Sequence, residues 1–515
     1  MSGEAGRAPV LMVLGTASSV GKSLLVTALC RAFRQRGVDV APFKAQNMSN
    51  NAAVTADGLE IGRAQAEQAA AAGLEPTVEM NPVLLKPTGD RRSHVILDGR
   101  PAGVLGSADF TERKATLWPH VERALDALRS RHALVIAEGA GSPAEPNLQA
   151  SDIVNLAVAR HAAAVTLIVA DIDRGGAFAH LLGTYELVPP ADRRLIRGFV
   201  LNRFRGDPDL LQPAIADLER RTAIPTIGVV PWIEGVSLAD EDAVALERRS
   251  PTSNAAGDLD IAVIQFPRIA NFDDFDPLAA EPGVGVRYVG ARAELGTPDL
   301  IVLPGTRATV ADLAWLRANQ LDGAIEARAQ AGARVLGICG GFQMLGRQLT
   351  DPAGVEAEVG TKVEGLGLLP LETVFEAEKT TRRVRGVALG GPGPWELVRG
   401  APVGGYEIHM GVSAGEVSPL LEIGGAPHGA ISDDGSVAGA YVHGLFHNDA
   451  FRRGLLAGLG RAADETADSA TDLREREFDR LAEVVRAHLD LERIEGWLWP
   501  DGRQASEGSS SSRRA

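Results

Sequence analysis

The sequence has little cysteine, no long apolar run and no excess of positive charge. Only two cysteines, Cys30 and Cys339, occur among 515 residues, which excludes a disulfide framework. No apolar stretch approaches the ~18 residues that a membrane-spanning helix needs. Acidic residues outnumber basic ones by 67 to 52, and a net charge of −15 argues against general affinity for nucleic acid or anionic membranes. We therefore expect a cytoplasmic protein with small-molecule substrates.

The beginning of the sequence lacks a basic region followed by a long apolar stretch and a small-residue cleavage site, so we expect no signal peptide. The chain is too long for one ordinary core, which predicts at least two domains. The sequence does not decide between a monomer and a homo-oligomer.

Short apolar runs alternate with helical patterns, which is typical of parallel sheets covered by helices and predicts an α/β fold. In the first half the predicted strands are residues 10–14, 38–43, 134–137, 165–170, 198–201 and 227–230, and two predicted helices are 23–36 and 59–72. In the second half the predicted strands are 261–265, 286–289, 300–303, 335–338, 404–409 and 437–443, and the predicted helices are 342–349 and 473–491.

The stretch VLGTASSVGKSLL follows the first predicted strand and opens the first predicted helix. In such loops backbone N–H groups cradle phosphates, a lysine neutralises them and a serine binds Mg²⁺, which points to Lys22 and Ser23. Gly15 and Gly21 enclose one residue more than the common Walker A loop, and Thr16 lies inside it. We therefore predict an ATP site with Mg²⁺.

Polar residues follow several of the predicted strands, where parallel sheets place ligand-binding groups. They are Lys44, Glu138, Asp171, Asp173 and Asn202. Glu138 is the preferred Mg²⁺ ligand beside Ser23, because hard cations favour carboxylate oxygen near phosphate. The alternative for each carboxylate is a helix cap or a surface charge.

Cys339 lies at a predicted strand-to-helix turn, in the stretch ARVLGICGGFQMLG. The surrounding glycines permit strained backbone angles, and a helix N-terminus favours a thiolate and an oxyanion. We predict a nucleophile here, against the alternative of a small buried side chain, which is our interpretation of Cys30. The predicted base is His443, at the rim of a sheet, and His409 is its competitor.

The motif GICGGFQ resembles the nucleophile elbow of the triad-type glutamine amidotransferases, and LPGT at residues 303–306 resembles their oxyanion loop. The resemblance implies backbone oxyanion donors at Gly305 and Gly340 and glutamine contacts from Gln343 and Tyr406. The glutamate that many of these enzymes carry two positions after the histidine is Leu445 here. The sequence does not show what orients the imidazole.

The longer phosphate loop resembles that of dethiobiotin synthetase, and by this resemblance Asn202 contacts adenine. Blocks such as PFKAQNMSNN, EIGRAQAEQA, ADIDRGGAFAHLLGT, NFDDFDPL and YVHGLFHND are similar to those of the glutamine-hydrolysing cobyric acid synthases. This resemblance implies ATP-dependent amidation of the b, d, e and g carboxylates of adenosylcobyrinic acid a,c-diamide. The residues that it implies for substrate binding or activation are Lys44, Asn47, Asn51, Arg63, Asp171, Asp173 and Arg174.

On this basis the sequence predicts an ATP-dependent synthetase domain at 9–233 and an amidotransferase domain at 259–460. The remaining parts are a disordered N-terminus at 1–8, a linker at 234–258, a helical extension at 461–504 and a disordered tail at 505–515. One alternative function is the cobyrinate a,c-diamide synthase, which has the same domain types. The other is a non-catalytic nucleotide switch, which has no need of Cys339 or His443.

Overall fold

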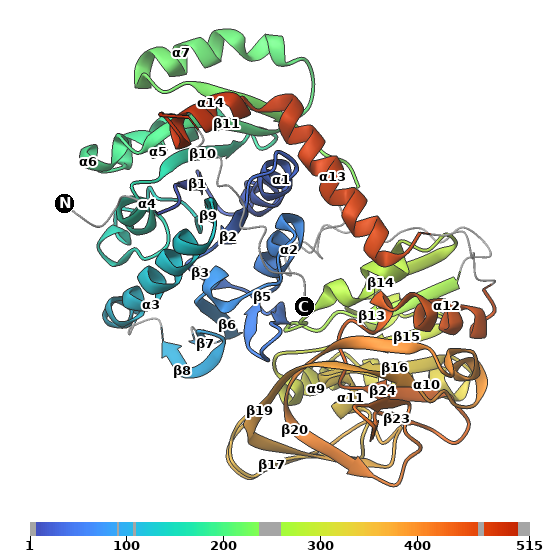
Figure 1. Ribbon diagram of the computed structural model, residues 1–515. Helices are drawn as coiled ribbons and strands as arrows, with labels where there is room; N and C mark the ends of the chain where they lie inside the picture. The colour runs from blue at the N-terminus through green and yellow to red at the C-terminus, as the bar shows by residue number, and fades with distance from the viewer. Residues whose placement is uncertain (1–6, 90–91, 107–109, 236–258, 462–467, 503–515) are drawn as a thin grey trace, which may run out of the picture. The chain divides into compact units, whose positions relative to one another are not determined.

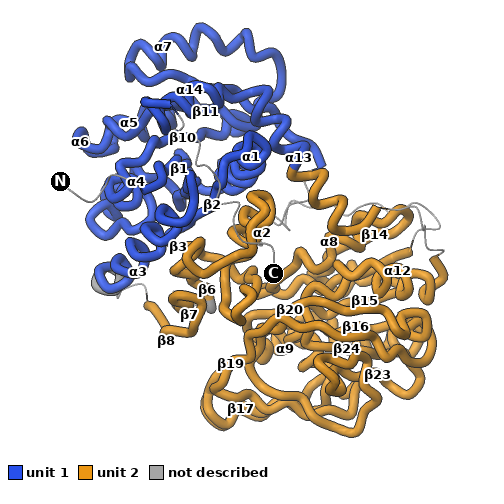
Figure 2. The backbone as a smooth tube through the Cα atoms, viewed as in Figure 1, with its two compact units in different colours: residues 1–45, 114–235, 479–515 blue, residues 46–113, 236–478 orange. Residues whose placement is uncertain are grey.

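The chain folds into two compact units, each made of segments that are distant in the sequence (Figure 2). The computed structural model describes all residues except 1–6, 90–91, 107–109, 236–258, 462–467 and 503–515. Unit 1 comprises residues 1–45, 114–235 and 479–515, and unit 2 comprises residues 46–113 and 236–478. The predicted tail at 505–515 and nearly all of the predicted linker lie outside the described residues.

Unit 1 is built on a six-stranded parallel sheet with the strand order β12-β11-β10-β1-β9-β2 (Figure 1). Its strands are β1 (Val10–Gly15), β2 (Val40–Phe43), β9 (Leu134–Glu138), β10 (Val165–Asp171), β11 (Ile196–Phe204) and β12 (Thr226–Pro231). Every residue of β1 and β9 is buried, so both faces of the sheet are covered. The six strands predicted for the first half are all present.

The helices of unit 1 are α1 (Lys22–Gln35), α4 (Leu156–Ala162), α5 (Ala177–Leu187), α6 (Pro190–Arg193), α7 (Gln212–Thr222) and α14 (Leu491–Leu498). Two further helices, α3 (Phe110–Arg131) and α13 (Ala470–His488), contribute residues to both units. The backbone N–H of Asp490 donates to the carbonyl oxygen of Ile227, which attaches the segment between α13 and α14 to β12.

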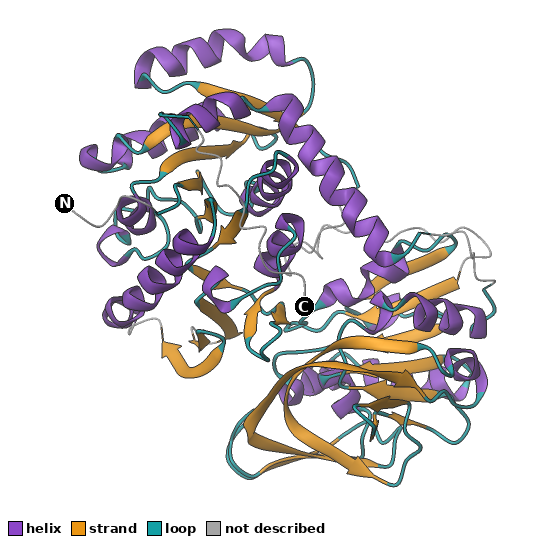
Figure 3. Ribbon diagram, viewed as in Figure 1, coloured by secondary structure: helices purple, strands orange, loops and turns teal. Residues whose placement is uncertain are grey.

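Unit 2 contains a second six-stranded sheet, in the order β14-β13-β15-β16-β24-β23, and only β23 runs antiparallel to its neighbour. Both units contain strands, drawn in orange, and helices, drawn in purple (Figure 3). Its strands are β13 (Leu259–Ile264), β14 (Val284–Val289), β15 (Leu300–Leu303), β16 (Arg334–Ile338), β23 (Ala430–Ile431) and β24 (Val437–Ala440). Its helices are α8 (Asp276–Ala279), α9 (Thr309–Ala318), α10 (Leu321–Gln330), α11 (Gly340–Met344) and α12 (Asp449–Gly458). Ile261 and Val263 join one hydrophobic cluster and Ala262 and Ile264 another, because alternate strand residues face opposite sides.

Further β-structure completes unit 2. One sheet contains β17 (Gln348–Asp351), β18 (Thr361–Glu364), β19 (Leu371–Ala388), β20 (Pro402–Gly415), β21 (Leu421–Ile423) and β22 (Ala426–His428). Segment 46–113 contributes β3 (Gln46–Met48), β4 (Ala52–Val54), β5 (Glu60–Gly62), β6 (Val83–Gly89), β7 (Arg92–Leu97), β8 (Arg100–Gly106) and α2 (Arg63–Ala72).

The predicted α/β class, with a mostly parallel sheet in each half, is confirmed. Several predicted elements were wrong in extent; for example, the helix predicted at 473–491 is α13, which ends at His488. The helix predicted at 59–72 begins at Arg63, because residues 60–62 pair with β4 as a strand. The helix predicted at 342–349 ends at Met344, since β17 begins at Gln348, and the strand predicted to end at His443 ends at Ala440. No helix in the described ranges has the length and apolar character needed to cross a bilayer.

Candidate active site

The phosphate loop of unit 1 joins β1 to α1. Gly21 caps α1 with a φ of +93°, a conformation that glycine adopts without strain. Lys22 Nζ donates to the carbonyl oxygens of Ala17 at 2.9 Å and Gly141 at 3.2 Å. The hydroxyl oxygen of Thr16 is buried and has no hydrogen-bond partner among the described residues. A lysine and an unsatisfied hydroxyl in a loop at a helix N-terminus fit a phosphate group.

Several of the predicted ligand-binding groups meet at the carboxyl ends of the unit 1 strands. Ser23 Oγ and Lys44 Nζ both donate to Glu138 Oε1, each at 2.8 Å. Asn202 Nδ2 donates to the carbonyl oxygen of Val20 at 2.8 Å, so its side chain contacts the phosphate loop. Hydroxyl and carboxylate oxygens beside a phosphate loop are donors that Mg²⁺ prefers, which fits the prediction for Ser23 and Glu138. No group of three or more His, Cys, Asp or Glu residues in the described part of the chain has an arrangement that could hold a metal ion, so Mg²⁺ would also need phosphate or water oxygens.

The acidic residues after β10 are paired with arginines. Asp171 Oδ2 forms ion pairs with Arg203 at 2.9 Å and Arg174 at 3.3 Å, and Asp173 pairs with Arg205 at 3.2 Å. Arg203 and Arg205 were not among the residues predicted from the sequence, although both closely follow the predicted Asn202. Their guanidinium groups add positive charge at the edge of the sheet that carries the phosphate loop.

The predicted substrate residues divide between the units. Lys44, Asp171, Asp173 and Arg174 belong to unit 1, whereas Asn47, Asn51 and Arg63 belong to unit 2. Asn47 is fully buried, and its Nδ2 donates to Gln65 Oε1 at 2.8 Å. Asn51 and Arg63 contact residues 271–273 of unit 2.

In unit 2, Cys339 forms a sharp turn between β16 and α11. Its φ and ψ angles are +51° and −111°, a strained conformation for a residue with a side chain. The side chain is buried, with the residue 6% exposed, and Sγ lies 3.5 Å from the carbonyl oxygen of Ile408 as a hydrogen-bond donor. Cys30, by contrast, is fully buried in α1, and burial raises the pKa of its thiol far above the ordinary value. Strain at a strand-to-helix turn is the geometry expected of a nucleophile elbow.

His443 connects Cys339 to a carboxylate that the sequence analysis missed. His443 Nδ1 forms a 2.7 Å hydrogen bond with Asp274 Oδ2, and Cys339 is near enough to raise the pKa of the same ring. Asp274 Oδ1 accepts a second bond from the backbone N–H of Gly444 at 2.8 Å. Asp274 therefore orients the imidazole. In many related sites a glutamate two positions after the histidine has this role, and in this chain that position is Leu445.

The charge state of His443 follows from these contacts. Burial disfavours the charged ring, but the negative charges of Asp274 and Cys339 outweigh it and raise the pKa of His443 to about 10. The imidazole is thus protonated at neutral pH.

The other predicted groups surround this cluster. A Cβ on Gly305, a predicted oxyanion donor, would lie 2.7 Å from His443 Cε1, so the backbone at Gly305 approaches the ring more closely than a side chain allows. Gly340 is the first residue of α11, immediately after the thiol. The Tyr406 ring stacks on His443 with a centroid separation of 5.3 Å, and its buried hydroxyl has no partner among the described residues. This hydroxyl is a polar group available to a ligand.

Gln343 and His409 have protein partners. Gln343 Nε2 donates to the carbonyl oxygen of Met410 at 2.8 Å, and its Oε1 accepts from Thr309 Oγ1 at 3.0 Å. His409 stacks on Tyr441 with ring centroids 3.8 Å apart, and burial lowers its pKa to about 4. His443 is hydrogen-bonded to the carboxylate of Asp274, whereas His409 Nδ1 donates to the carbonyl oxygen of Gly411 at 3.0 Å.

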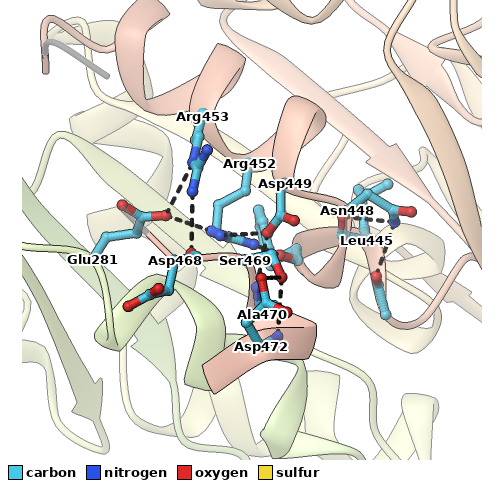
Figure 4. Close-up of polar contacts among 12 residues, drawn as sticks. Glu281, Leu445, Asn448, Asp449, Arg452, Arg453, Asp468, Ser469, Ala470 and Asp472 are labelled. Carbon is cyan, nitrogen blue, oxygen red and sulfur yellow. Dashed lines mark hydrogen bonds and ion pairs between the residues drawn. The ribbon is translucent and has the colours of Figure 1, made fainter. Parts of the chain in front are cut away.

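The segment after His443 is fixed by its own contacts (Figure 4). Asn448 Nδ2 donates to the carbonyl oxygens of Gly444 and Leu445, each at 3.1 Å. Buried Arg452 donates to Glu281 at 2.7 Å and to the carbonyl oxygen of Phe446 at 2.7 Å. These contacts hold the backbone that presents the imidazole.

Asp274 lies in the block NFDDFDPL, which the sequence analysis used only as a resemblance. The available signal was a run of acidic residues shortly after the strand at 261–265, the end of a parallel strand where functional groups collect. The run contains three aspartates, at positions 273, 274 and 276, and the sequence offers no means of choosing among them.

Two family models match the chain. Residues 260–451 match the CobB/CobQ-like glutamine amidotransferase domain, and residues 11–246 match the CobQ/CobB/MinD/ParA nucleotide binding domain. The second match includes segment 46–113, which folds with unit 2.

Curated relatives match over almost their whole length. The Cobyric acid synthase of Roseiflexus castenholzii is 53% identical over 96% of this chain and 100% of its own. Those of Chloroflexus aurantiacus and Sorangium cellulosum are 54% and 50% identical over 94% of this chain each and 98% of their own lengths. With this identity and coverage, and with both domain types present, the chain belongs to the cobyric acid synthase family.

Proposed function

We propose that this protein amidates the b, d, e and g carboxylates of adenosylcobyrinic acid a,c-diamide in the cytoplasm, with ATP as activator and glutamine as nitrogen source. Its relatives and its two domain types support the proposal. The observation that carries it is that one chain holds both a phosphate loop with Lys22 and Ser23 and a buried Cys339–His443–Asp274 cluster. A carboxylate does not react with ammonia until it is activated, and ammonia is mostly protonated in water. The phosphate loop is suited to activate the carboxylate, and the thiol cluster is suited to release neutral ammonia from glutamine.

In the amidotransferase half, the Cys339 thiolate attacks the side-chain amide carbon of glutamine. The backbone N–H groups of Gly305 and Gly340 stabilise the oxyanion, and His443 gives its proton to the departing nitrogen, which leaves as ammonia. His443 then takes a proton from water, which hydrolyses the glutamyl thioester to glutamate and regenerates the thiol. Asp274 holds the imidazole through Nδ1, so that the other ring nitrogen exchanges protons. Tyr406 and Gln343 are predicted to contact glutamine.

In the synthetase half, a corrinoid carboxylate oxygen attacks the γ-phosphorus of ATP, ADP leaves, and an acyl phosphate forms. Ammonia adds to the acyl carbon, and phosphate leaves to give the amide. Lys22 and the loop N–H groups stabilise the transferred phosphoryl group. Ser23 and Glu138 are suited to hold Mg²⁺, which supplies neutralisation of phosphate charge. Asn202 is predicted to contact adenine, and Lys44, Asn47, Asp171, Asp173 and Arg174 are predicted to serve the corrinoid or its activation.

The direct test is incubation of the purified protein with the a,c-diamide, Mg-ATP and glutamine, followed by mass spectrometry of the corrinoids. We expect stepwise conversion of carboxylic acids to amides, with ADP and glutamate formed for each amide. Amidation of cobyrinate at its a and c carboxylates, with no reaction of the a,c-diamide, would favour the diamide synthase instead. Nucleotide hydrolysis without any glutamate release would favour the nucleotide switch.

A further inference from the structure

The carboxylate that orients His443 sits on a tight turn. Asn271 begins this turn with a φ of +52°, a left-handed conformation that is uncommon for residues with a side chain, although asparagine adopts it more readily than most. The backbone N–H of Asp274 donates to the Asn271 carbonyl oxygen at 3.1 Å. The position of Asp274 therefore depends on a backbone conformation that its surroundings must stabilise.

That stabilisation comes from segment 46–113, which lies in the nucleotide-binding family match. Asn51 Oδ1 accepts from the backbone N–H of Asn271 at 2.7 Å, and Asn271 Oδ1 accepts from the backbone N–H of Ala52 at 2.9 Å. Asn51 and Asn271 are both buried. This reciprocal pair fixes the first residue of the turn from both its backbone and its side chain.

Arg63 makes a second contact with the same turn. Arg63 Nε lies 2.9 Å from Asp273 Oδ2, and its Nη2 lies 3.1 Å from Glu67 Oε1. The side chains of Arg63, Asp273 and Glu67 are 14%, 4% and 9% exposed, so solvent screens this pair weakly. Arg63 thus places a positive charge beside Asp273, and the next residue, Asp274, orients the catalytic imidazole.

The charge around the turn explains why a cation is needed. Asp273, Asp274 and Asp276 lie within four positions, and Glu67 adds a further carboxylate to the neighbourhood of Asp273. Burial and the negative charges of Asp274, Asp276 and Glu67 raise the pKa of Asp273 to about 7, and the charge of Arg63 limits this rise. Without Arg63, the ion pair that holds Asp273 is lost, and repulsion between the adjacent carboxylates would displace the turn.

We propose that Arg63 and Asn51 are positioning residues of the thiol site: they hold the 271–274 turn so that Asp274 meets His443. Glutamine hydrolysis by the C-terminal half of the sequence thereby depends on residues of the N-terminal half. The proposal rests on the amidotransferase function assigned to Cys339 and His443. It gives Arg63 and Asn51 a role other than the substrate contact predicted from the sequence.

The test compares Arg63→Gln with wild type in the full-length protein. We expect kcat for glutamine hydrolysis to fall about tenfold with the KM for glutamine within about twofold, because the turn moves but the glutamine pocket does not. Amidation with ammonium salt should fall much less. Arg63→Lys, which keeps the charge, should recover a large part of kcat. Arg474→Gln is the matched control, since Arg474 contacts the same Glu67 at 3.9 Å and is not paired with Asp273 in the structure.

A second variant separates positioning from loss of folding. If Arg63 acts by balancing Asp273, the Arg63→Gln/Asp273→Asn double variant should lose less glutaminase activity than the product of the two single losses. Three outcomes would overturn the proposal. The double variant could lose as much activity as the product of the two single losses, Arg63→Gln could leave glutaminase activity unchanged, or the loss could be equal with glutamine and with ammonia. Equal losses would instead support the substrate role predicted from the sequence. A wild-type protein that releases no glutamate from glutamine would overturn the proposed function itself.

Discussion

The two strand-to-helix turns of this protein, the phosphate loop before α1 and the thiol turn before α11, have the same architecture but are completed differently. In the phosphate loop a glycine, Gly21, takes the left-handed conformation, and Lys22 is hydrogen-bonded to backbone carbonyl oxygens. In the thiol turn the reactive residue itself is strained, and its partners His443 and Asp274 are already in place.

The difference reflects what each turn has to bind. A phosphate group is already charged, so the loop needs only hydrogen-bond donors and space for it. The hydroxyl of Thr16, which has no partner among the described residues, is one such donor. A thiol must be activated by the protein, so its turn needs a base and a carboxylate from elsewhere in the chain. The thiol turn should therefore be sensitive to substitutions at many positions, and the phosphate loop mainly to substitutions within itself.

The largest expected effect is that of Cys339→Ala. We expect glutamine hydrolysis to fall by at least about 10³-fold, because no other group can form the thioester. Amidation with ammonium salt should continue at a similar rate. Glutamate release and corrinoid mass spectra measure the two activities. Loss of the ammonia-dependent activity in a folded variant would show that the two centres are not separable.

Lys22→Ala should give the reverse pattern. We expect amidation to fall by about 10²- to 10³-fold with either glutamine or ammonia, because the lysine no longer stabilises the transferred phosphoryl group. Glutamine hydrolysis without nucleotide should be unchanged. ADP release measures the first activity, and Arg36→Gln, an exposed change after the same helix α1, is the control. An unaltered rate of ADP formation would contradict the assignment of the loop.

Asp274→Asn tests the carboxylate that completes the thiol turn. We expect kcat for glutamine hydrolysis to fall by about 10²-fold, because the imidazole loses its orientation and the charge that stabilises its cation. The ammonia-dependent activity serves as the internal control. A variant with wild-type kcat would show that the 2.7 Å contact has no catalytic role.

The same variant has a pH signature. The pKa of His443 is raised from 6.5 to about 10, so its pairing stabilises the fold fully below about pH 6.5 and loses this effect as pH rises through 10. Wild type should therefore melt at a higher temperature than Asp274→Asn at pH 6, and the gap should narrow toward pH 10. Differential scanning calorimetry at several pH values measures it, and a constant gap would contradict the charged pair.

Gly305→Ala should have the smallest effect of this set. The new Cβ would approach His443 Cε1 to 2.7 Å, so the ring or the oxyanion loop must shift, and we expect about a tenfold loss of kcat. Gly323→Ala is the matched control, since a Cβ added at this position of α10 would have no atom of the described residues within 4 Å. Equal activity of the two variants would show that the loop adapts.

Local pattern was enough to predict the α/β class, the unit 1 strands and both reactive turns. Runs of apolar residues define strands covered on both faces, and glycines beside Lys22 and Cys339 mark sharp turns. The errors of extent have local causes too: residues 60–62 continue the helical pattern of α2 but pair with β4 across a short loop. Pairing of this kind overrides intrinsic preference.

Sequence alone thus determined the two chemistries of this protein, because a phosphate loop and a thiol elbow are each encoded within about a dozen neighbouring residues. Tertiary structure alone decided which carboxylate meets His443, since Asp274 lies 169 positions away along the chain. It also decided that Asn51 and Arg63 fold with the amidotransferase unit. Contacts between distant residues depend on how whole elements pack, and no local periodicity records that packing.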